Sequence, residues 1–105
     1  GGAHPQSNTA FTLAGSSSKG ERLQAFPNPT SGGLTVSYLV PADQQVQLQL
    51  LSPSGQLLAQ PVAGPAQSGV QTLRLPLQQM VPGSGLYFLR VQMDAYSETV
   101  KLQVR

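Results

Sequence analysis

The chain has 105 residues, of which 39% are hydrophobic and only 10% are charged, and its net charge is +2. This length suits one domain with a modest core, and so low a charge excludes disorder of the highly charged kind. The absence of cysteine excludes disulfides and thiolate metal sites, no apolar run reaches the roughly 20 residues of a membrane helix, and the six basic residues are too scattered to bind nucleic acid.

The first segment, residues 1–20, is predicted to be a flexible linker because Gly, Ser, Asn and Pro dominate it. Its first residues have the composition of a tag remnant. The single histidine, His4, lies here with no apolar pattern to hold it, so it lacks the support that a catalytic base needs. Composition changes near Glu21, and the folded domain is therefore predicted over residues 21–105.

Seven short segments of period-two alternation follow the linker. With 11 Gly and 9 Pro in the chain, long helices are disfavoured. Pro61 and Pro76 mark the fourth and fifth segments as edge strands or as interrupted strands, because proline has no N–H to donate. The pattern predicts an all-β fold, a seven-stranded antiparallel immunoglobulin-like β-sandwich, with a small barrel as the alternative. The predicted strands are 23–26, 34–40, 46–50, 57–62, 70–77, 87–93 and 100–104.

Two connections have a readable geometry. Ser52-Pro53-Ser54-Gly55 has the residues that a type I turn prefers. A two-residue turn at Asp94-Ala95 would fix the register of the last hairpin, although a primed turn wants a residue tolerant of positive φ at Ala95. In this register the apolar sets share one face, whereas a slip of one residue would turn Lys101 towards the core. The predicted pairs are Met93–Tyr96, Val91–Glu98, Leu89–Val100, Tyr87–Leu102, Phe88–Lys101, Arg90–Thr99 and Gln92–Ser97.

The sequence offers no catalytic or cofactor site. The four carboxylates are expected to be solvated surface acids, and only Asp94 and Glu98 are near enough in sequence to be neighbours; the other two are Glu21 and Asp43. No metal-ligand spacing and no Gly-rich phosphate loop appears. The chain is therefore expected to be a non-enzyme without cofactor or metal.

Three motifs occur in order along the chain: Phe26-Pro27-Asn28-Pro29-Thr30 with Gly32 just after, the segment Gly85–Val91, and Lys101–Arg105. Together they resemble the C-terminal sorting domain (type A) of type IX secretion cargo from Bacteroidetes-type bacteria. The Leu50–Leu58 segment, with Gly55, is similar to a strand–turn–strand of that family. The resemblance covers about residues 22–105.

The resemblance implies a non-catalytic secretion signal. Such a domain directs its cargo from the periplasm across the outer membrane, where the translocon and its shuttle protein recognise it. A sortase-like protease then removes the domain, and the cargo ends at the cell surface or outside the cell. Cleavage is expected within residues 1–20. The rival interpretation is an immunoglobulin-like or fibronectin type III-like accessory module for spacing, adhesion or carbohydrate binding, in which only Tyr38, Tyr96 and Phe88 could stack on a sugar.

The motif residues carry specific expectations. Pro27, Asn28 and Pro29 form either the kink by which the first strand changes sheets or a receptor contact. Gly85 is expected to supply an unusual backbone conformation at a strand start. Tyr87 is expected to bury its ring and to bond its hydroxyl.

The terminal hairpin is the candidate for receptor contact. Phe88 and Lys101 are cross-strand neighbours on the otherwise polar face, and Arg90 and Arg105 add charge to a recognition patch there. Alternatively, a neighbouring loop covers Phe88. A free edge strand also predicts strand addition by the translocon or by a second copy, which would give a homodimer.

Overall fold

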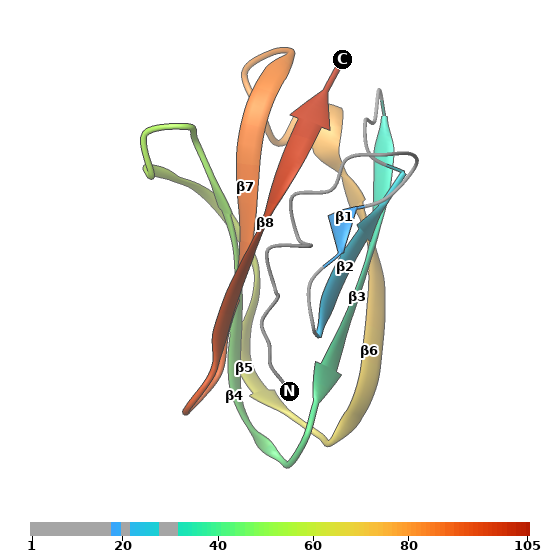
Figure 1. The fold of residues 1–105 in the computed structure, drawn as a ribbon, viewed down its shortest axis with the longest axis vertical. Coiled ribbons are helices and arrows are strands. Elements are labelled where there is room, and N and C mark those ends of the chain that lie inside the picture. The colour runs from blue at the N-terminus through green and yellow to red at the C-terminus, as the bar shows by residue number, and fades with distance from the viewer. Residues whose placement is uncertain (1–17, 20–21, 28–31) are drawn as a thin grey trace.

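The computed structural model describes residues 18–19, 22–27 and 32–105, and it is a two-layer β-sandwich (Figure 1). The sheets have the strand orders β1-β2-β3-β6 and β5-β4-β7-β8, and every pairing is antiparallel. The sandwich prediction is confirmed, and the barrel alternative is wrong. The elements are β1 (Ser18–Lys19), β2 (Leu23–Phe26), β3 (Gly33–Val40), β4 (Gln44–Leu51), β5 (Leu57–Ala66), β6 (Gly69–Pro76), the 3₁₀ turn η2 (Leu77–Gln79), β7 (Gly85–Gln92) and β8 (Ser97–Val104).

The core lies between the two sheets and is built from the alternating apolar positions that the sequence displays. Leu34, Val36 and Val40 of β3 and Leu48 of the opposite sheet belong to one buried cluster and have no exposed surface. Side chains at every second position point the same way from a strand, so period-two patterning yields one dry and one wetter face per sheet. Such burial contributes roughly 25 cal/mol per Å² of apolar surface removed from water.

Seven observed strands correspond to the seven predicted ones, and the short β1 adds an eighth. Ser18 and Lys19 of β1 lie within the predicted linker and pair with Ala25 and Gln24 of β2. β5 and β6 are edge strands, as Pro61 and Pro76 predict. Strand β6 ends at Pro76, one residue earlier than predicted, because Leu77 begins the 3₁₀ turn.

The hairpin of β7 and β8 has the predicted register from Tyr87–Leu102 to Gln92–Ser97. The N–H of Met93 donates to the carbonyl of Tyr96 at 2.7 Å, which closes the connection around Asp94 and Ala95. No non-glycine residue of the described chain has a positive φ, so this turn is not of the primed type.

The connection from β4 to β5 is the predicted type I turn, closed by a 2.9 Å bond from the N–H of Gly55 to the carbonyl of Ser52. Gly55 has φ +92°, in the region that favours glycine, and the N–H of Ser52 donates to the carbonyl of Gln56 at 2.8 Å. This turn-plus-bulge is a common three-residue hairpin loop. Among the described residues, no helix has the length and apolarity that crossing a membrane requires.

Candidate recognition surface

The outer face of the β5-β4-β7-β8 sheet carries a cross-strand row that joins four strands. Leu51 of β4 pairs with Leu57 of β5 and with Phe88 of β7, and Phe88 pairs with Lys101 of β8. Residues in direct cross-strand register have neighbouring side chains, so three apolar groups and one ammonium stem lie side by side. We call these four residues, together with Arg90 and Arg105, the recognition surface.

Leu51 marks the row as unusual. It follows the alternating Val46, Leu48 and Leu50 out of phase, so its side chain points away from the core cluster, of which it is not a member. Nevertheless only 7% of it is exposed, whereas Leu57 beside it is 50% exposed and Phe88 is half-buried. The row therefore forms a small apolar layer on the outside of the sheet, over a backbone that already has a complete core beneath it.

Arg90, at the next outward-facing position of β7 after Phe88, is held in place by hydrogen bonds. Its Nε and one Nη donate to Oε1 of Gln49 at 2.9 and 2.6 Å, and the Nε2 of Gln49 donates to Oε1 of Gln60 at 3.1 Å. This polar chain runs across β7, β4 and β5, directly beside the apolar row. A guanidinium anchored by one neutral amide keeps its full charge and donors for a further acceptor.

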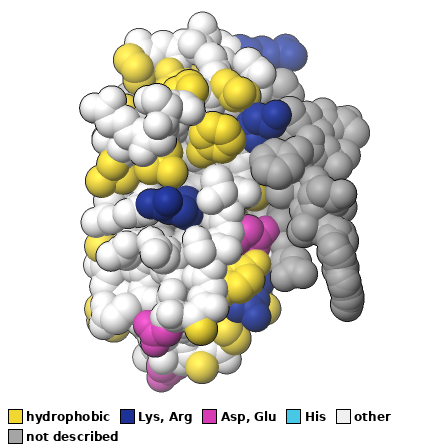
Figure 2. Space-filling model, turned by 60° about the vertical axis from the view of Figure 1, so that its left-hand side comes forward, with side chains coloured by type: hydrophobic (Ala, Val, Ile, Leu, Met, Phe, Trp, Pro, Cys, Tyr) yellow, Lys and Arg dark blue, Asp and Glu magenta, His cyan; other side chains and the backbone are white. Residues whose placement is uncertain are grey.

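Charged side chains of both signs lie on this side of the molecule. Figure 2 shows hydrophobic side chains over the upper part of the view with basic ones beside and above them, and acidic ones in its middle and lower parts, where a further basic side chain lies near them. Lys101 lies in the apolar row, and Arg105 is exposed just after β8. Asp43 and Asp94 are exposed near the other end of the sheet, where they line a hollow together with Gln44. An acidic or polar partner is therefore favoured at the basic end.

Gly85 and Tyr87 lie near the same end of the sheet but inside it. Gly85 has φ +145°, which confirms the predicted unusual backbone at the strand start. Tyr87 is 6% exposed, and its hydroxyl donates to the carbonyl of Gly83 at 2.7 Å, which confirms the predicted buried ring and bonded hydroxyl. Both residues therefore have a structural role at the start of β7, and the ring of Tyr87 belongs to the core cluster.

Of the proline motif, the structure describes Pro27, which directly follows β2 of the other sheet. Pro27 is exposed just after β2, and the peptide bond between Phe26 and Pro27 is cis. Asn28 and Pro29 lie outside the described residues. The structure thus brings Phe88, Arg90 and Lys101 to one face, leaves Arg105 exposed just after β8, and places Pro27 at the end of β2 in the other sheet.

The expectation that Glu98 is a solvated surface acid is wrong. This residue is half-buried, and its Oε1 accepts the backbone N–H of Arg22 at 2.9 Å and the hydroxyl of Tyr96. Glu98 sits on the inward-facing side of β8, where the opposite sheet approaches, so it is not a solvated surface acid. Tyr38 is only 4% exposed, so it is not available to stack on a sugar, and of the three aromatics that the accessory-module interpretation offered Tyr96 and Phe88 remain. Burial also raises the pKa of Tyr38.

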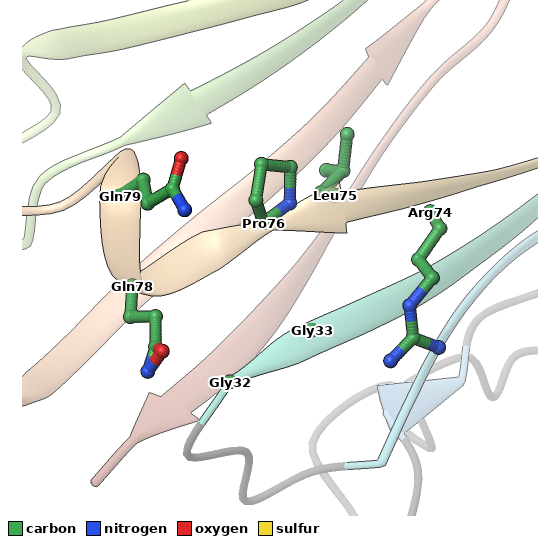
Figure 3. Close-up of a pocket in the computed structure, with 7 residues that line it drawn as sticks. All are labelled: Gly32, Gly33, Arg74, Leu75, Pro76, Gln78 and Gln79. Carbon is green, nitrogen blue, oxygen red and sulfur yellow. The ribbon is translucent and has the colours of Figure 1, made fainter.

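A separate hollow of about 330 Å³ opens on the first sheet, between the start of β3 and η2 (Figure 3). The guanidinium of Arg74 lies against Gly33 there; a Cβ on Gly33 would come within 2.6 Å of its Nη2. Gln78 and Gln79 of η2 complete the lining. No group of three or more metal-ligating side chains occurs in the part of the chain that the structure describes.

Sequence reasoning missed Leu51, Leu57 and Gln49 as members or supports of this surface. The sequence did contain a signal for Leu51 in the alternation of β4. The outward positions before it are Gln45, Gln47 and Gln49, and Leu51 is the only apolar residue at an outward position of this strand. An apolar residue that breaks a polar phase indicates cover on the outer face.

A known protein family matches most of this chain. The family model of the secretion system C-terminal sorting domain matches residues 24–105, which include both sheets except β1 and the start of β2. Searches of the curated proteins and of the solved structures returned no match. The family is a sorting signal, not a catalytic domain, and its cargo is secreted across the outer membrane. The chain belongs to the family of secretion system C-terminal sorting domains, the signals that direct cargo into type IX secretion.

Proposed function

We propose that the secretion machinery binds this domain at the recognition surface. The machinery comprises the outer-membrane translocon and its shuttle protein. The observation that carries the proposal is the row Leu51–Phe88–Lys101, an apolar layer placed outside a complete core. A solvated sheet face has no need of a large ring beside a buried leucine, whereas binding surfaces combine apolar anchors with a polar rim.

Basic groups supply the rim of this surface. Arg90 is oriented by Gln49, and Lys101 and Arg105 come from the terminal strand and its end. Aromatic and arginine side chains dominate binding energy at interfaces, so Phe88 and Arg90 are the expected anchors. The partner surface is accordingly expected to be apolar at its centre and acidic or rich in carbonyl oxygen at its edge.

The test is secretion of a fluorescent periplasmic cargo fused ahead of the whole chain in a host that has the type IX system. Phe88→Ala and Lys101→Glu are expected to retain the cargo in the periplasm. Gln92→Ala is the matched control, because Gln92 is an exposed residue on the same face of β7. Deleting the terminal strand would be uninformative, since β8 supplies Val100, Leu102 and Val104 to the core.

A urea midpoint for each purified variant separates recognition from folding. Secretion that equals the unsubstituted level in both variants, with both folded, would contradict the proposal. Loss of secretion in the Gln92→Ala control would equally contradict it, because the effect would not be specific to the row.

Removal of the domain is the second part of the proposed function. Residues 1–20 have a linker composition, which suits a sortase-like protease because a protease needs an extended and accessible chain. Since Ser18 and Lys19 pair with β2, we expect the cleaved bond before Ser18, with the cargo then found at the cell surface or in the medium. Mass spectrometry of released cargo locates the bond, and a cut within residues 34–105 would refute this assignment.

A further inference from the structure

Four strands form the edges of the two sheets, and β6 is the one whose edge carries no protection among the described residues. β5 contains Pro61 and Pro65, and β8 contacts β1 and β2 of the opposite sheet. β1 has only two residues. β6 offers eight residues with proline only at its end, and an open strand of this kind is a template for another strand.

The single charge of β6 does not guard that edge. Arg74 turns its side chain towards β3 and lays its guanidinium against Gly33, as Figure 3 shows. Its neighbours on the same face, Val70 and Thr72, are exposed, Val70 by 67%. A charged residue protects an edge by covering it, and Arg74 is directed the other way.

The register shows which backbone groups of β6 are open. Pro76 pairs with Gly33 but has no N–H, so this pair is of the non-hydrogen-bonded type. The ladder from Gly33–Pro76 to Val40–Gly69 has no register shift, so Ser37–Thr72 and Leu39–Val70 are of the same type. A separate hydrogen bond supports this assignment. The N–H of Leu39 donates to the carbonyl of Arg22 at 3.1 Å, so it points away from β6. The N–H and C=O of Val70, Thr72 and Arg74 therefore point to the open edge.

These three residues are self-complementary. A second copy placed antiparallel, with Thr72 opposite the partner's Thr72, brings Val70 opposite the partner's Arg74 and forms three hydrogen-bonded pairs. That is about six backbone hydrogen bonds, at two for each such pair. Arg74 then meets a valine, not a second arginine, and Pro76 falls beyond the paired segment, so neither like charge nor a missing donor opposes this register.

We propose that two copies of this chain join through β6, in a two-fold pairing centred on Thr72 that makes one continuous sheet across the dimer. An isologous contact of this kind closes on itself and forms no fibre. The pairing uses the first sheet and no residue of the recognition surface, so its outcome is independent of the sorting role.

Cysteine cross-linking of the full chain tests the register, because the native sequence contains no cysteine. In Thr72→Cys the two Cα atoms would lie about 5.5 Å apart, within the roughly 4.4–6.8 Å that a disulfide spans. Val70→Cys is the matched control: it is exposed on the same face, but the two copies' residues 70 would be four positions apart, about 14 Å along the strand. Thr72→Cys is expected to convert to covalent dimer under mild oxidation while Val70→Cys stays monomeric.

Sedimentation of the unsubstituted chain gives the second measurement. The expected mass is twice that of one chain at concentrations above about 100 μM, and Thr72→Lys, which sets two ammonium groups face to face, should return it to the monomer. Gln45→Lys, on an exposed outward position of β4, should leave the dimer intact. A monomer at every concentration, or equal cross-linking of the two cysteine variants, would overturn the proposal and leave β6 open for a strand of another protein.

Discussion

The guanidinium carbon of Arg22 lies 4.0 Å from the centroid of the Tyr96 ring. The same two residues share Glu98, which accepts the hydroxyl of Tyr96 and the backbone N–H of Arg22. Arg22 precedes β2 in one sheet, and Tyr96 and Glu98 belong to the terminal hairpin of the other. A cation over a ring and a shared carboxylate thus fasten the first residues of the folded domain to the last hairpin.

This cluster gives the first prediction. Glu98→Ala leaves a partly buried N–H of Arg22 without its acceptor, so the free energy of unfolding should fall by about 1–3 kcal/mol. Tyr96→Phe keeps the ring under Arg22 and should cost only about 0.5–1.5 kcal/mol. Urea unfolding measures both. Equal stability of Glu98→Ala and the unsubstituted chain would show that the cluster does not fasten the hairpin.

Gly85 gives the second prediction. Because its φ of +145° is strained for any side chain, Gly85→Ala should lower the free energy of unfolding by about 1–3 kcal/mol. Gly83→Ala is the control two residues earlier: Gly83 has no positive φ, and a Cβ there meets nothing within 4 Å. Thermal unfolding compares the two. A larger loss in the Gly83 variant would be incompatible with backbone strain as the cause.

The hydroxyl of Tyr87 gives the third prediction. Tyr87→Phe removes the 2.7 Å bond to the carbonyl of Gly83 and keeps the ring in the core, so a loss of about 0.5–1.5 kcal/mol is expected. Tyr87→Ala removes the ring as well and should cost about 3–5 kcal/mol, as large-to-small changes of core aromatics do. Chemical denaturation ranks the variants, and a phenylalanine variant as unstable as the alanine one would contradict the separation of hydroxyl from ring.

The fourth prediction concerns alkaline pH. Burial raises the pKa of Tyr38 above its ordinary value of 10.0, so the unfolded chain releases this proton at lower pH than the folded one. The unfolded state then binds fewer protons, and the free energy of unfolding should decrease as pH rises from about 10 through the folded-state pKa. In Tyr38→Phe this part of the decrease should vanish. A Tyr38→Phe profile that falls as steeply as that of the unsubstituted chain would disprove the assignment.

Much of the fold could be predicted because period-two alternation reports local burial. The strand predicted over Leu34–Val40 and the pairing of Phe88 with Lys101 both follow from the same requirement, that the apolar residues lie together on the buried face. Pro61 and Pro76 placed their strands at sheet edges for an equally local reason, the missing N–H. Strand ends were less predictable, since β5 continues to Ala66 through two prolines that an edge position tolerates.

The contacts between sheets could not be predicted in the same way. Which end of β2 meets β8 depends on how the layers stack, and no spacing in the sequence brings Arg22 to Glu98, 76 positions away. The apolar layer had only a faint signal, the out-of-phase Leu51, and its meaning required the register that joins Leu57, Leu51 and Phe88. The sequence therefore indicated Phe88 and its neighbour Lys101, but not the apolar neighbours Leu51 and Leu57.

Strand β7 is paired on both sides, with β4 and with β8, and its two faces have different surroundings. Tyr87, Leu89 and Val91 are packed inside the sandwich, while Phe88 and Arg90 are displayed on its outside. During divergence of such domains, this one strand leaves evolution little freedom: a replacement at an odd-numbered position threatens the fold, and one at an even-numbered position alters what is displayed. Substitutions should accordingly accumulate slowly in this strand.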